Sequence, residues 1–293
     1  MHCRECGYTF RPQKKHHTKD RRWLRTYLAD GSSFRRLGER CERWGVSGST
    51  AWRRIQRTER STVRVGVLIG FHLPHSVRVL MLDAKHFVIR KRPFTLYVAF
   101  DAERMMPLTW ILLPRYEVRD GYDRILRHLA RTKVEIASVV SDWSTSIRAS
   151  VRDSVPHAIH QHCAFHVLAD ALRKLGGRRL LQSEHGKEVW KKIRRVGIGY
   201  DTLPAARHAV RRLKKKYPQY VRAWNVLGRH LVGIYQFTKL PTLKGYRTSN
   251  RIENFMGVLE QRLKSFRSMK TSDTCIKIVS SLIEFKYKRP TKK

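Results

Sequence analysis

Three strand-like runs follow one another between residues 79 and 113, and they constrain the fold more than any other feature of the chain. Residues 79–89, 94–101 and 107–113 are rich in β-branched and aromatic side chains, and only short connections separate them. Short connections favour antiparallel pairing, because parallel strands need a long crossover. The sequence therefore predicts a β-meander at the start of a domain that contains both strands and helices.

A helix, a strand, a second helix and a last strand are predicted after the meander. Residues 119–132 have helical periodicity, residues 134–141 form an apolar strand, a short helix starts at Ser144, and residues 158–161 are a fifth strand. The apolar face of the first helix is made by Tyr122, Ile125, Leu126 and Leu129. The order β-β-β-α-β-α-β is that of an α/β domain of the RNase H-like, retroviral integrase-like class.

Three carboxylates occupy recognisable settings in this pattern. Asp83 lies in VLMLDAKHFVI and Asp142 ends VEIASVVSDW, so both are expected at the ends of apolar strands. Glu253 follows two good N-cap residues and is expected in the first turn of a helix. Mg²⁺ prefers carboxylate oxygen, and two such ions about 4 Å apart can catalyse phosphodiester cleavage. We therefore predict that these three acids are catalytic and bind two Mg²⁺ or Mn²⁺ ions.

Each acid taken alone has a simpler interpretation. Asp83 fits a turn at a strand end, Asp142 fits a helix cap, and Glu253 fits an acid stabilised by the helix dipole. Their order and spacing favour the catalytic interpretation. The 59 positions from Asp83 to Asp142 accommodate the predicted strands and helix, and the 111 positions from Asp142 to Glu253 require an insertion in the domain.

The charge of the chain predicts a polyanionic partner. Lys and Arg number 62 against 23 Asp and Glu, a formal net charge of +39, and each phosphate contact favours binding by releasing counterions. The predicted helical insertion, about 164–247, is strongly basic, since residues 171–247 hold 20 basic and 3 acidic side chains. We expect it to form a positively charged wall over a nucleic-acid channel. A ribosomal-type structural protein is the alternative, but such chains lack strands that end in acids.

Residues 20–60 predict an all-α helix-turn-helix domain. Gly45 makes the turn, and Ser47 or Ser49 can cap the last of three short helices. The outward side chains expected to contact DNA in the major groove are Arg53, Arg54 and Arg57. A generic amphipathic three-helix bundle is the alternative, against which the turn glycine and the capping serine argue.

Residues 1–19 have the character of a partial zinc ribbon. Cys3 and Cys6 have the Cys-x-x-Cys spacing of a Zn²⁺ site, but a second pair is missing, so the segment is either a zinc site completed by His16 and His17 or a remnant of one. Residues 61–78 are expected to be a linker, and residues 79–293 the catalytic domain. With no secretory signal and no apolar run of about 18 residues, we expect a cytoplasmic, nucleoid-associated protein without a membrane segment.

This set of motifs resembles the DDE transposases, most closely the Mutator-like group of bacterial and archaeal insertion sequences, over nearly the whole chain. That family carries an Asp at the end of the first strand, an Asp after the fourth strand and a Glu on a late helix. Here Asp83, Asp142 and Glu253 match these positions. The family also carries a Cys- or Asp-x-x-His signature where its helical insertion begins, and Cys163 and His166 match it in QHCAFHVLADAL.

The resemblance implies a neighbourhood for the three acids. From the motif alone, Cys163 is a buried small residue and His166 a satisfied polar one, whereas the resemblance implies that His166 lies beside the active site. Trp143 is expected either to stack near the site or to pack in the core. A zinc site from one Cys and one His is not expected. Further residues expected near the site or against DNA are Asn250, Arg247, Arg262, Lys264 and Arg267.

The function implied is that of a transposase. It would bind the terminal inverted repeats of its element as double-stranded DNA, cut the 3′ ends with metal ions, and join them to target DNA. One site must act at each end, so a homodimer or higher assembly is expected. Two alternatives use the same domain: a transposase-derived DNA-binding regulator without catalysis, and an RNase H-like structure-selective nuclease.

Overall fold

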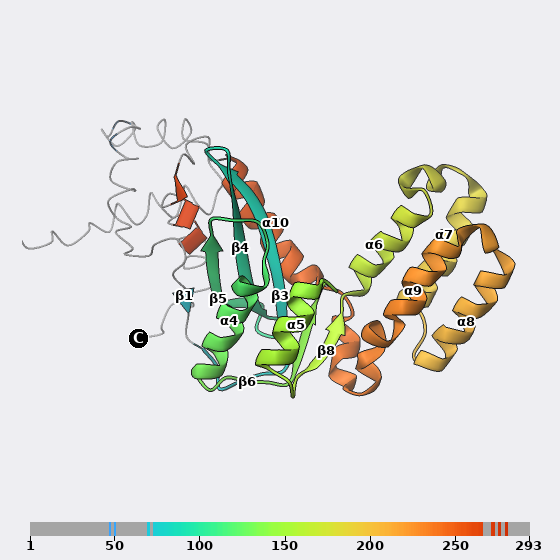
Figure 1. Ribbon diagram of the computed structural model, residues 1–293, viewed down its shortest axis with the longest axis horizontal. Helices are drawn as coiled ribbons and strands as arrows, with labels where there is room; N and C mark the ends of the chain where they lie inside the picture. The colour runs from blue at the N-terminus through green and yellow to red at the C-terminus, as the bar shows by residue number, and fades with distance from the viewer. Residues whose placement is uncertain are drawn as a thin grey trace, which may run out of the picture. The chain divides into compact units, whose positions relative to one another are not determined.

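The computed structural model of the chain describes residues 47, 50, 69–70, 73–265, 271–272, 275–276 and 279–280 (Figure 1). The chain divides into two compact units, residues 64–258 and a unit formed by residues 1–63 and 259–293. The fold described below is that of residues 64–258. The predicted zinc-ribbon-like segment and almost all of the predicted helix-turn-helix lie outside the described residues, so both stay predictions, as do the domain boundaries.

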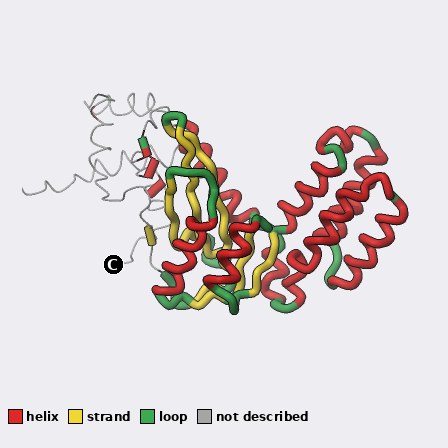
Figure 2. The backbone as a smooth tube through the Cα atoms, viewed as in Figure 1, coloured by secondary structure: helices red, strands yellow, loops and turns green. Residues whose placement is uncertain are grey.

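A six-stranded mixed sheet forms the centre of this unit (Figure 2). Its antiparallel part consists of β3 (Leu80–Ile89), β4 (Arg92–Asp101) and β5 (Met106–Leu113), paired in that order. The short strand β1 (Ile69–Gly70) pairs with the outer edge of β5. The predicted meander is therefore confirmed, and β4 is buried from Phe94 to Asp101 because both of its faces are covered.

Two parallel strands continue the sheet on the other side of β3. β7 (Ser138–Ser141) pairs with β3, and β8 (Ile159–His162) pairs with β7. The complete strand order is β1-β5-β4-β3-β7-β8. β3, the first strand of the meander, thus lies in the middle of the sheet, between β4 and β7.

The segment before β7 differs from the prediction. Residues 134–141 were expected to form one strand, but β6 (Glu135–Ile136) pairs in parallel with β2 (Ser76–Val77) in a separate two-stranded sheet. The chain then changes partner, and the Ala137 N–H donates to the Val77 carbonyl at 3.0 Å. The expected linker, residues 61–78, thus contains two short paired strands, since β1 pairs with β5 and β2 pairs with β6.

Helices cover both faces of the sheet. α4 (Arg119–Arg131) and α5 (Thr145–Ser154) cover one face, where the predicted apolar residues of α4 are buried. Tyr97 of β4 packs edge-on against Tyr122 of α4, with ring centroids 5.0 Å apart. On the other face, Phe255 of α10 (Asn250–Ser265) packs against Phe100 of β4. Alternate residues of β4 thus point to opposite layers, and α10 lies on the side of the sheet away from α4 (Figure 1).

Four α-helices form the region between β8 and α10. They are α6 (Ala164–Lys174), α7 (Glu184–Ile198), α8 (Leu203–Lys216) and α9 (Val221–Ile234). Short 3-10 turns join or follow them: η1 (Gly177–Gln182), η2 (Pro218–Tyr220), η3 (Tyr235–Thr238) and η4 (Pro241–Tyr246). Ser183 caps α7 and Thr202 caps α8 through side-chain hydrogen bonds. The predicted helical insertion is confirmed as a helical region, and its core includes the fully buried Trp224.

A buried glutamine on β8 fixes the chain that returns from the helices to the sheet. Gln161 donates its amide to the carbonyls of Leu243 and Tyr246, at 3.3 and 3.0 Å, and accepts from the Phe237 N–H at 2.9 Å. These bonds satisfy every strong polar atom of its side-chain amide in a buried setting. The start of α10 follows directly, so β8 and α10 are held in a defined relation.

Candidate active site

Asp83 lies on β3, and Asp142 directly follows β7, the parallel strand that pairs with β3. The register of the parallel pair matches Leu80 with Val139 and Met81 with Val140, an offset of 59 positions. The same offset separates Asp83 from Asp142. Continuing the register by two residues therefore places the two acids at the same level of the sheet.

Asp83 is not at the end of its strand, which corrects the prediction. β3 continues to Ile89 because it pairs with β4 along its whole length. Its pairing with β7, however, is limited to Leu80 and Met81. Asp83 thus sits where one edge of β3 is no longer covered by a strand, so a rigid central strand presents a carboxylate at an opening in the sheet.

Asp142 follows β7 directly and shapes the turn into α5. Its Oδ1 accepts from the Ser144 N–H at 3.0 Å, while the Ser144 hydroxyl caps α5 by accepting from Ile147. Ser144 therefore caps α5. The Asp142 carboxylate does not cap the helix but accepts from the backbone N–H of Ser144. This contact fixes the carboxylate at the carboxyl end of β7.

The electrostatic environment of Asp83 shows that acids converge at this place. Burial raises the pKa of Asp83 from 3.8 to about 7, the Ala84 N–H bonded to Oδ1 at 2.8 Å lowers it, and His166 lowers it further. The carboxylates of Glu253 and Asp142 raise it. An acid perturbed both by burial and by two other acids is a candidate functional group.

Glu253 reaches the site from the first turn of α10. Its backbone N–H donates to the Ser249 carbonyl at 3.0 Å, and the Ser249 hydroxyl donates to Glu253 Oε1. The Oε1 atom lies 3.8 Å from Nδ1 of His166. The Glu253 side chain thus contacts a buried serine and a histidine. Stabilisation by the helix dipole is therefore not its only interaction.

Cys163 and His166 lie at the start of α6, between the sheet and α10. The Cys163 N–H extends the β7–β8 ladder by donating to the Ser141 carbonyl at 2.7 Å. Its buried sulfur accepts from the Ser249 N–H at 3.2 Å and lies 3.0 Å from the Ser249 hydroxyl. The sulfur beside it, and then the charges of Glu253 and Asp83, raise the pKa of His166 to about 9 against the effect of burial. The structure therefore brings together all three predicted acids, Cys163 and His166.

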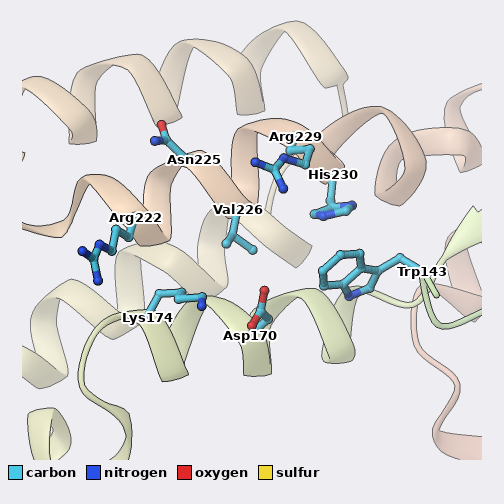
Figure 3. A pocket seen from close by; sticks show the side chains of 8 residues that line it. All are labelled: Trp143, Asp170, Lys174, Arg222, Asn225, Val226, Arg229 and His230. Atoms are coloured by element: carbon cyan, nitrogen blue, oxygen red, sulfur yellow. The ribbon is translucent and has the colours of Figure 1, made fainter. Parts of the chain in front are cut away.

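Trp143 forms the end of a basic pocket that begins beside Asp142. Its ring centroid lies 4.0 Å from that of His230 on α9. The pocket has a volume of about 560 Å³ and runs between α6 and α9 (Figure 3). Its lining consists of Trp143, Asp170, Lys174, Arg222, Asn225, Val226, Arg229 and His230.

Sequence reasoning missed the individual lining residues of this pocket. The basic bias of residues 171–247 predicted a positively charged wall, but helical periodicity does not reveal that Lys174 of α6 faces Arg222 and Arg229 of α9. Asp170 adds one buried carboxylate, paired with Arg173 at 3.3 Å. The sequence signal for this part of the pocket was Asp170, a single acid in a basic helix, followed three residues later by Arg173.

Two half-buried histidines of β8 lie near His230, the ring partner of Trp143. His160 of β8 bonds to the Ser141 hydroxyl at 2.8 Å, and the ring of His162 lies 5.8 Å from that of His230. Burial lowers the pKa of His160 to about 3 and that of His162 to about 4. These rings are therefore neutral at pH 7 and serve as packing groups at the junction of β8 and α9.

Arg247, which was predicted to contact DNA, is bonded within the protein. Its guanidinium donates to the carbonyls of Gly197 and Ile198 at 2.8 Å, at the C-terminal end of α7, and packs over the rings of Tyr235 and Phe237. Both terminal nitrogens thus anchor the end of α7, and the DNA contact stays a prediction. Asn250 is exposed at the first position of α10.

Several predicted residues cannot be placed as side chains. Arg262 and Lys264 lie on α10, but their side chains are outside the described structure. The other predicted residues outside the described part of the chain are Arg53, Arg54, Arg57, Arg267, Cys3 and Cys6. Their roles stay predictions.

A family of known proteins shares the sequence pattern that carries this geometry. The profile of the family described as "Transposase, Mutator family" matches residues 28–288. This match covers most of the 293 residues and includes every residue of the candidate site. The chain belongs to the Mutator family of transposases.

Comparisons with single proteins give weaker likenesses. A chain from the cryo-EM structure of the simian T-cell lymphotropic virus intasome in complex with PP2A regulatory subunit B56 gamma is 12% identical, with a TM-score of 0.24, and the match covers 48% of this chain and 51% of that one. A chain of the pre-cleavage Mos1 transpososome is 15% identical, with a TM-score of 0.20, and the match covers 52% of this chain and 62% of that one. This chain therefore spans between about half and three fifths of the solved chains that it matches. The comparison with curated proteins gives no match.

Membrane-spanning helices are not found among the described residues. None of the helices in that part of the chain is long and apolar enough to cross a bilayer.

Proposed function

We propose that this Mutator-family protein is a DDE transposase with an RNase H-like catalytic domain, which cuts DNA at the 3′ ends of its element and joins them to target DNA. The observation that carries the proposal is the convergence of the three acids: the β3–β7 register has the same offset of 59 positions as Asp83 and Asp142, and burial and then the charges of Glu253 and Asp142 raise the pKa of Asp83. The strand order β5-β4-β3-β7-β8, with the acids on β3, after β7 and on α10, supports the RNase H-like assignment.

The three acids fit a pair of divalent cations. Asp83 is partly buried and its pKa is raised by two other carboxylates, so a bound cation would relieve both desolvation and repulsion. Oxygen ligands of this kind suit Mg²⁺ or Mn²⁺. Bound Mg²⁺ supplies a lowered pKa for a coordinated water and charge stabilisation for the leaving oxygen. Asp83, Asp142 and Glu253 are the residues that would hold it.

The remaining residues of the site position the acids and balance their charge. Asp142 is oriented by Ser144, and Glu253 by Ser249. His166, whose pKa is raised to about 9, is a cation at pH 7 and lies beside Glu253. A fixed cation at this position can stabilise the negative charge of a scissile phosphate before and during the reaction.

The basic pocket supplies a path for the DNA strand next to Asp142. Lys174, Arg222 and Arg229 are exposed cations along the groove between α6 and α9. Phosphates would contact these three side chains, and Trp143, with its partner ring His230, offers an aromatic wall for a base or sugar at the end nearest Asp142. Double-stranded DNA is therefore the proposed partner, with the wall formed by the helical region.

The terminal segments complete the proposal. Residues 20–60, as a helix-turn-helix, would read the terminal inverted repeats through Arg53, Arg54 and Arg57. A homodimer or higher assembly on paired ends would supply one active site for each end. Zinc at Cys3 and Cys6 and a nucleoid-associated location are further parts of this proposal.

The test is a cleavage and strand-transfer assay with labelled DNA that carries the ends of the element. The purified full chain is compared with Asp142→Asn and with Asp153→Asn, an exposed acid on α5 whose partners are Arg119 and Arg152. We expect Mg²⁺- or Mn²⁺-dependent nicking at the repeat boundary in the parent and in Asp153→Asn, and none in Asp142→Asn.

The other outcomes identify a different protein. Tight binding to the ends without cleavage in either metal ion would indicate a DNA-binding regulator. Cleavage that is indifferent to the end sequence would indicate a structure-selective nuclease. Equal cleavage by Asp142→Asn would contradict the assignment of the site itself.

A further inference from the structure

We propose that Cys163, His166 and Glu253 form a Zn²⁺ site, distinct in its chemistry from the Mg²⁺ site proposed for the three acids. Their ligand atoms, a sulfur, a ring nitrogen and a carboxylate oxygen, all lie within 4.8 Å of one another. The sequence motif gave one Cys and one His, which are too few ligands for zinc. The fold adds Glu253 from a helix about 90 positions further along the chain.

The distances suit a tetrahedral ion. With Zn–S of about 2.3 Å and Zn–N and Zn–O of about 2.0–2.2 Å, ligand atoms of one tetrahedron lie roughly 3.4–3.6 Å apart. Nδ1 of His166 and Oε1 of Glu253 are already 3.8 Å apart. This Nδ1 is buried and lies beside the Cys163 sulfur and Glu253, and binding the ion would require His166 to lose the proton that these neighbours stabilise. Small side-chain movements would bring the three ligand atoms to these distances. His166 and Glu253 are partly exposed, so the ion and a fourth ligand can enter from solvent.

The surroundings are those of a supported metal site. The Cys163 sulfur accepts from the Ser249 N–H at 3.2 Å and lies 3.0 Å from the Ser249 hydroxyl, whose single proton can be donated either to the sulfur or to Glu253 Oε1. One serine therefore orients two of the three ligands, as outer-shell groups do in metal centres. A sulfur–nitrogen–oxygen set favours Zn²⁺ over Mg²⁺, because Mg²⁺ avoids thiolate.

The site has a consequence for the proposed catalytic centre. Zn²⁺ here would link the first turn of α6 to the first turn of α10, hold one oxygen of Glu253, and replace the protonated His166 as the positive charge beside that carboxylate. The binding inference itself goes beyond the proposed function and does not require it, since a chain without nuclease activity could still bind zinc.

The test is a Co²⁺ titration of the full chain carrying Cys3→Ser and Cys6→Ser, which removes the cysteine pair of the other predicted zinc site. With excess Mg²⁺ present to occupy the acids, we expect one Co²⁺ per chain with a near-ultraviolet thiolate-to-cobalt charge-transfer band, which Zn²⁺ displaces and Mg²⁺ does not. Cys163→Ser should abolish the band. Ser249→Ala, which removes one outer-shell hydroxyl, should weaken binding about 10- to 100-fold.

Further variants keep the test decisive if Cys163→Ser does not fold. His166→Ala and Glu253→Gln change partly exposed side chains and should each weaken binding by more than Ser249→Ala does, whereas Cys275→Ser and His157→Ala should leave it unchanged. Circular dichroism verifies that each variant is folded. Absence of a charge-transfer band in the folded Cys3→Ser, Cys6→Ser chain, or a band that survives Cys163→Ser, would overturn the proposal.

Discussion

At the candidate active site, carboxylates from β3, the end of β7 and α10 converge on a partly buried opening in the sheet, whereas α6 and α9 direct cations into an open groove. Both regions belong to the compact unit of residues 64–258. The acids are held by strand register and by single hydrogen bonds from Ser144 and Ser249. The cations of the pocket are exposed side chains on helices.

The difference follows from what each group has to do. Metal-ion chemistry depends on ligand positions to within a fraction of an ångström, so its residues belong on rigid elements. Phosphate contacts act over longer distances and tolerate flexible side chains, because each contributes mainly charge. We therefore expect substitutions in the first region to change catalysis, and those in the second to change DNA affinity.

The largest effect is expected for the acids. Asp83→Asn and Glu253→Gln should each reduce the rate of strand cleavage by at least about 10³-fold, because residues of a catalytic set act as a unit. DNA affinity in the presence of Ca²⁺ should change little, since loss of one negative charge only raises the formal net charge from +39 by one. Single-turnover cleavage and an electrophoretic binding assay measure the two quantities. If DNA affinity and cleavage rate fell in equal proportion in one of these variants, the proposal that the acids act in catalysis and the groove in DNA binding would be wrong.

The next effect is a pH dependence of stability that comes from Asp83. Its pKa is 3.8 in the unfolded chain and about 7 in the fold, so between these values the folded state binds more protons. Stability contributed by this group is therefore lost as pH rises from about 4 to 7, by about 4 kcal/mol at most. The test measures the free energy of unfolding of the parent and of Asp83→Asn in EDTA at several pH values. The difference, parent minus variant, should fall as pH rises from about 4 to 7.

Mg²⁺ should reverse this loss if the acids bind it, because the ion stabilises the ionised carboxylate. The melting temperature of the parent should then rise with Mg²⁺ more at pH 8 than at pH 5, with no such rise in Asp83→Asn. A difference between parent and variant that is flat with pH would show that Asp83 ionises normally.

A smaller effect is expected in the basic groove. Changing Lys174, Arg222 and Arg229 together to Ala should make the plot of log affinity against log salt concentration shallower, by roughly 0.9 for each phosphate that the variant no longer binds. The matched control changes three exposed arginines of α4, which are Arg124, Arg127 and Arg131. Equal slopes for the two triple variants would mean that net charge alone, and not the groove, attracts DNA.

The smallest effect separates two glycines of α9. A Cβ at Gly233 would lie 2.2 Å from Nδ1 of His162, whereas one at Gly228 would meet nothing within 4 Å. Gly233→Ala should therefore destabilise the fold by about 1–3 kcal/mol, and Gly228→Ala should stabilise it by roughly 0.5–1 kcal/mol. Chemical denaturation of both variants tests whether α9 is fitted closely to β8 at this point. Stabilisation by both alanines would contradict that close fit.

Much of the sheet and of the candidate site was accessible from sequence. The meander, α4 with its buried face, α5 after Ser144 and the helical region were predicted because their periodicity is a local property. The division of residues 134–141 between two sheets was not predicted, because an apolar run does not specify its pairing partner. The predicted strand 79–89 agrees with β3, but the sequence did not show that its pairing with β7 stops at Met81, which leaves Asp83 at an uncovered edge.

The sequence by itself determined which chemistry the chain carries: three acids in separate settings, a Cys-x-x-His motif and a basic helical segment. Only the tertiary structure decided which groups meet. It placed Asp83 on β3 beside β7, the strand that Asp142 follows, turned Arg247 inward onto the end of α7, and brought Glu253 to Cys163 and His166 through Ser249. Contacts between residues far apart in the chain depend on packing of whole elements, which local periodicity and spacing do not encode.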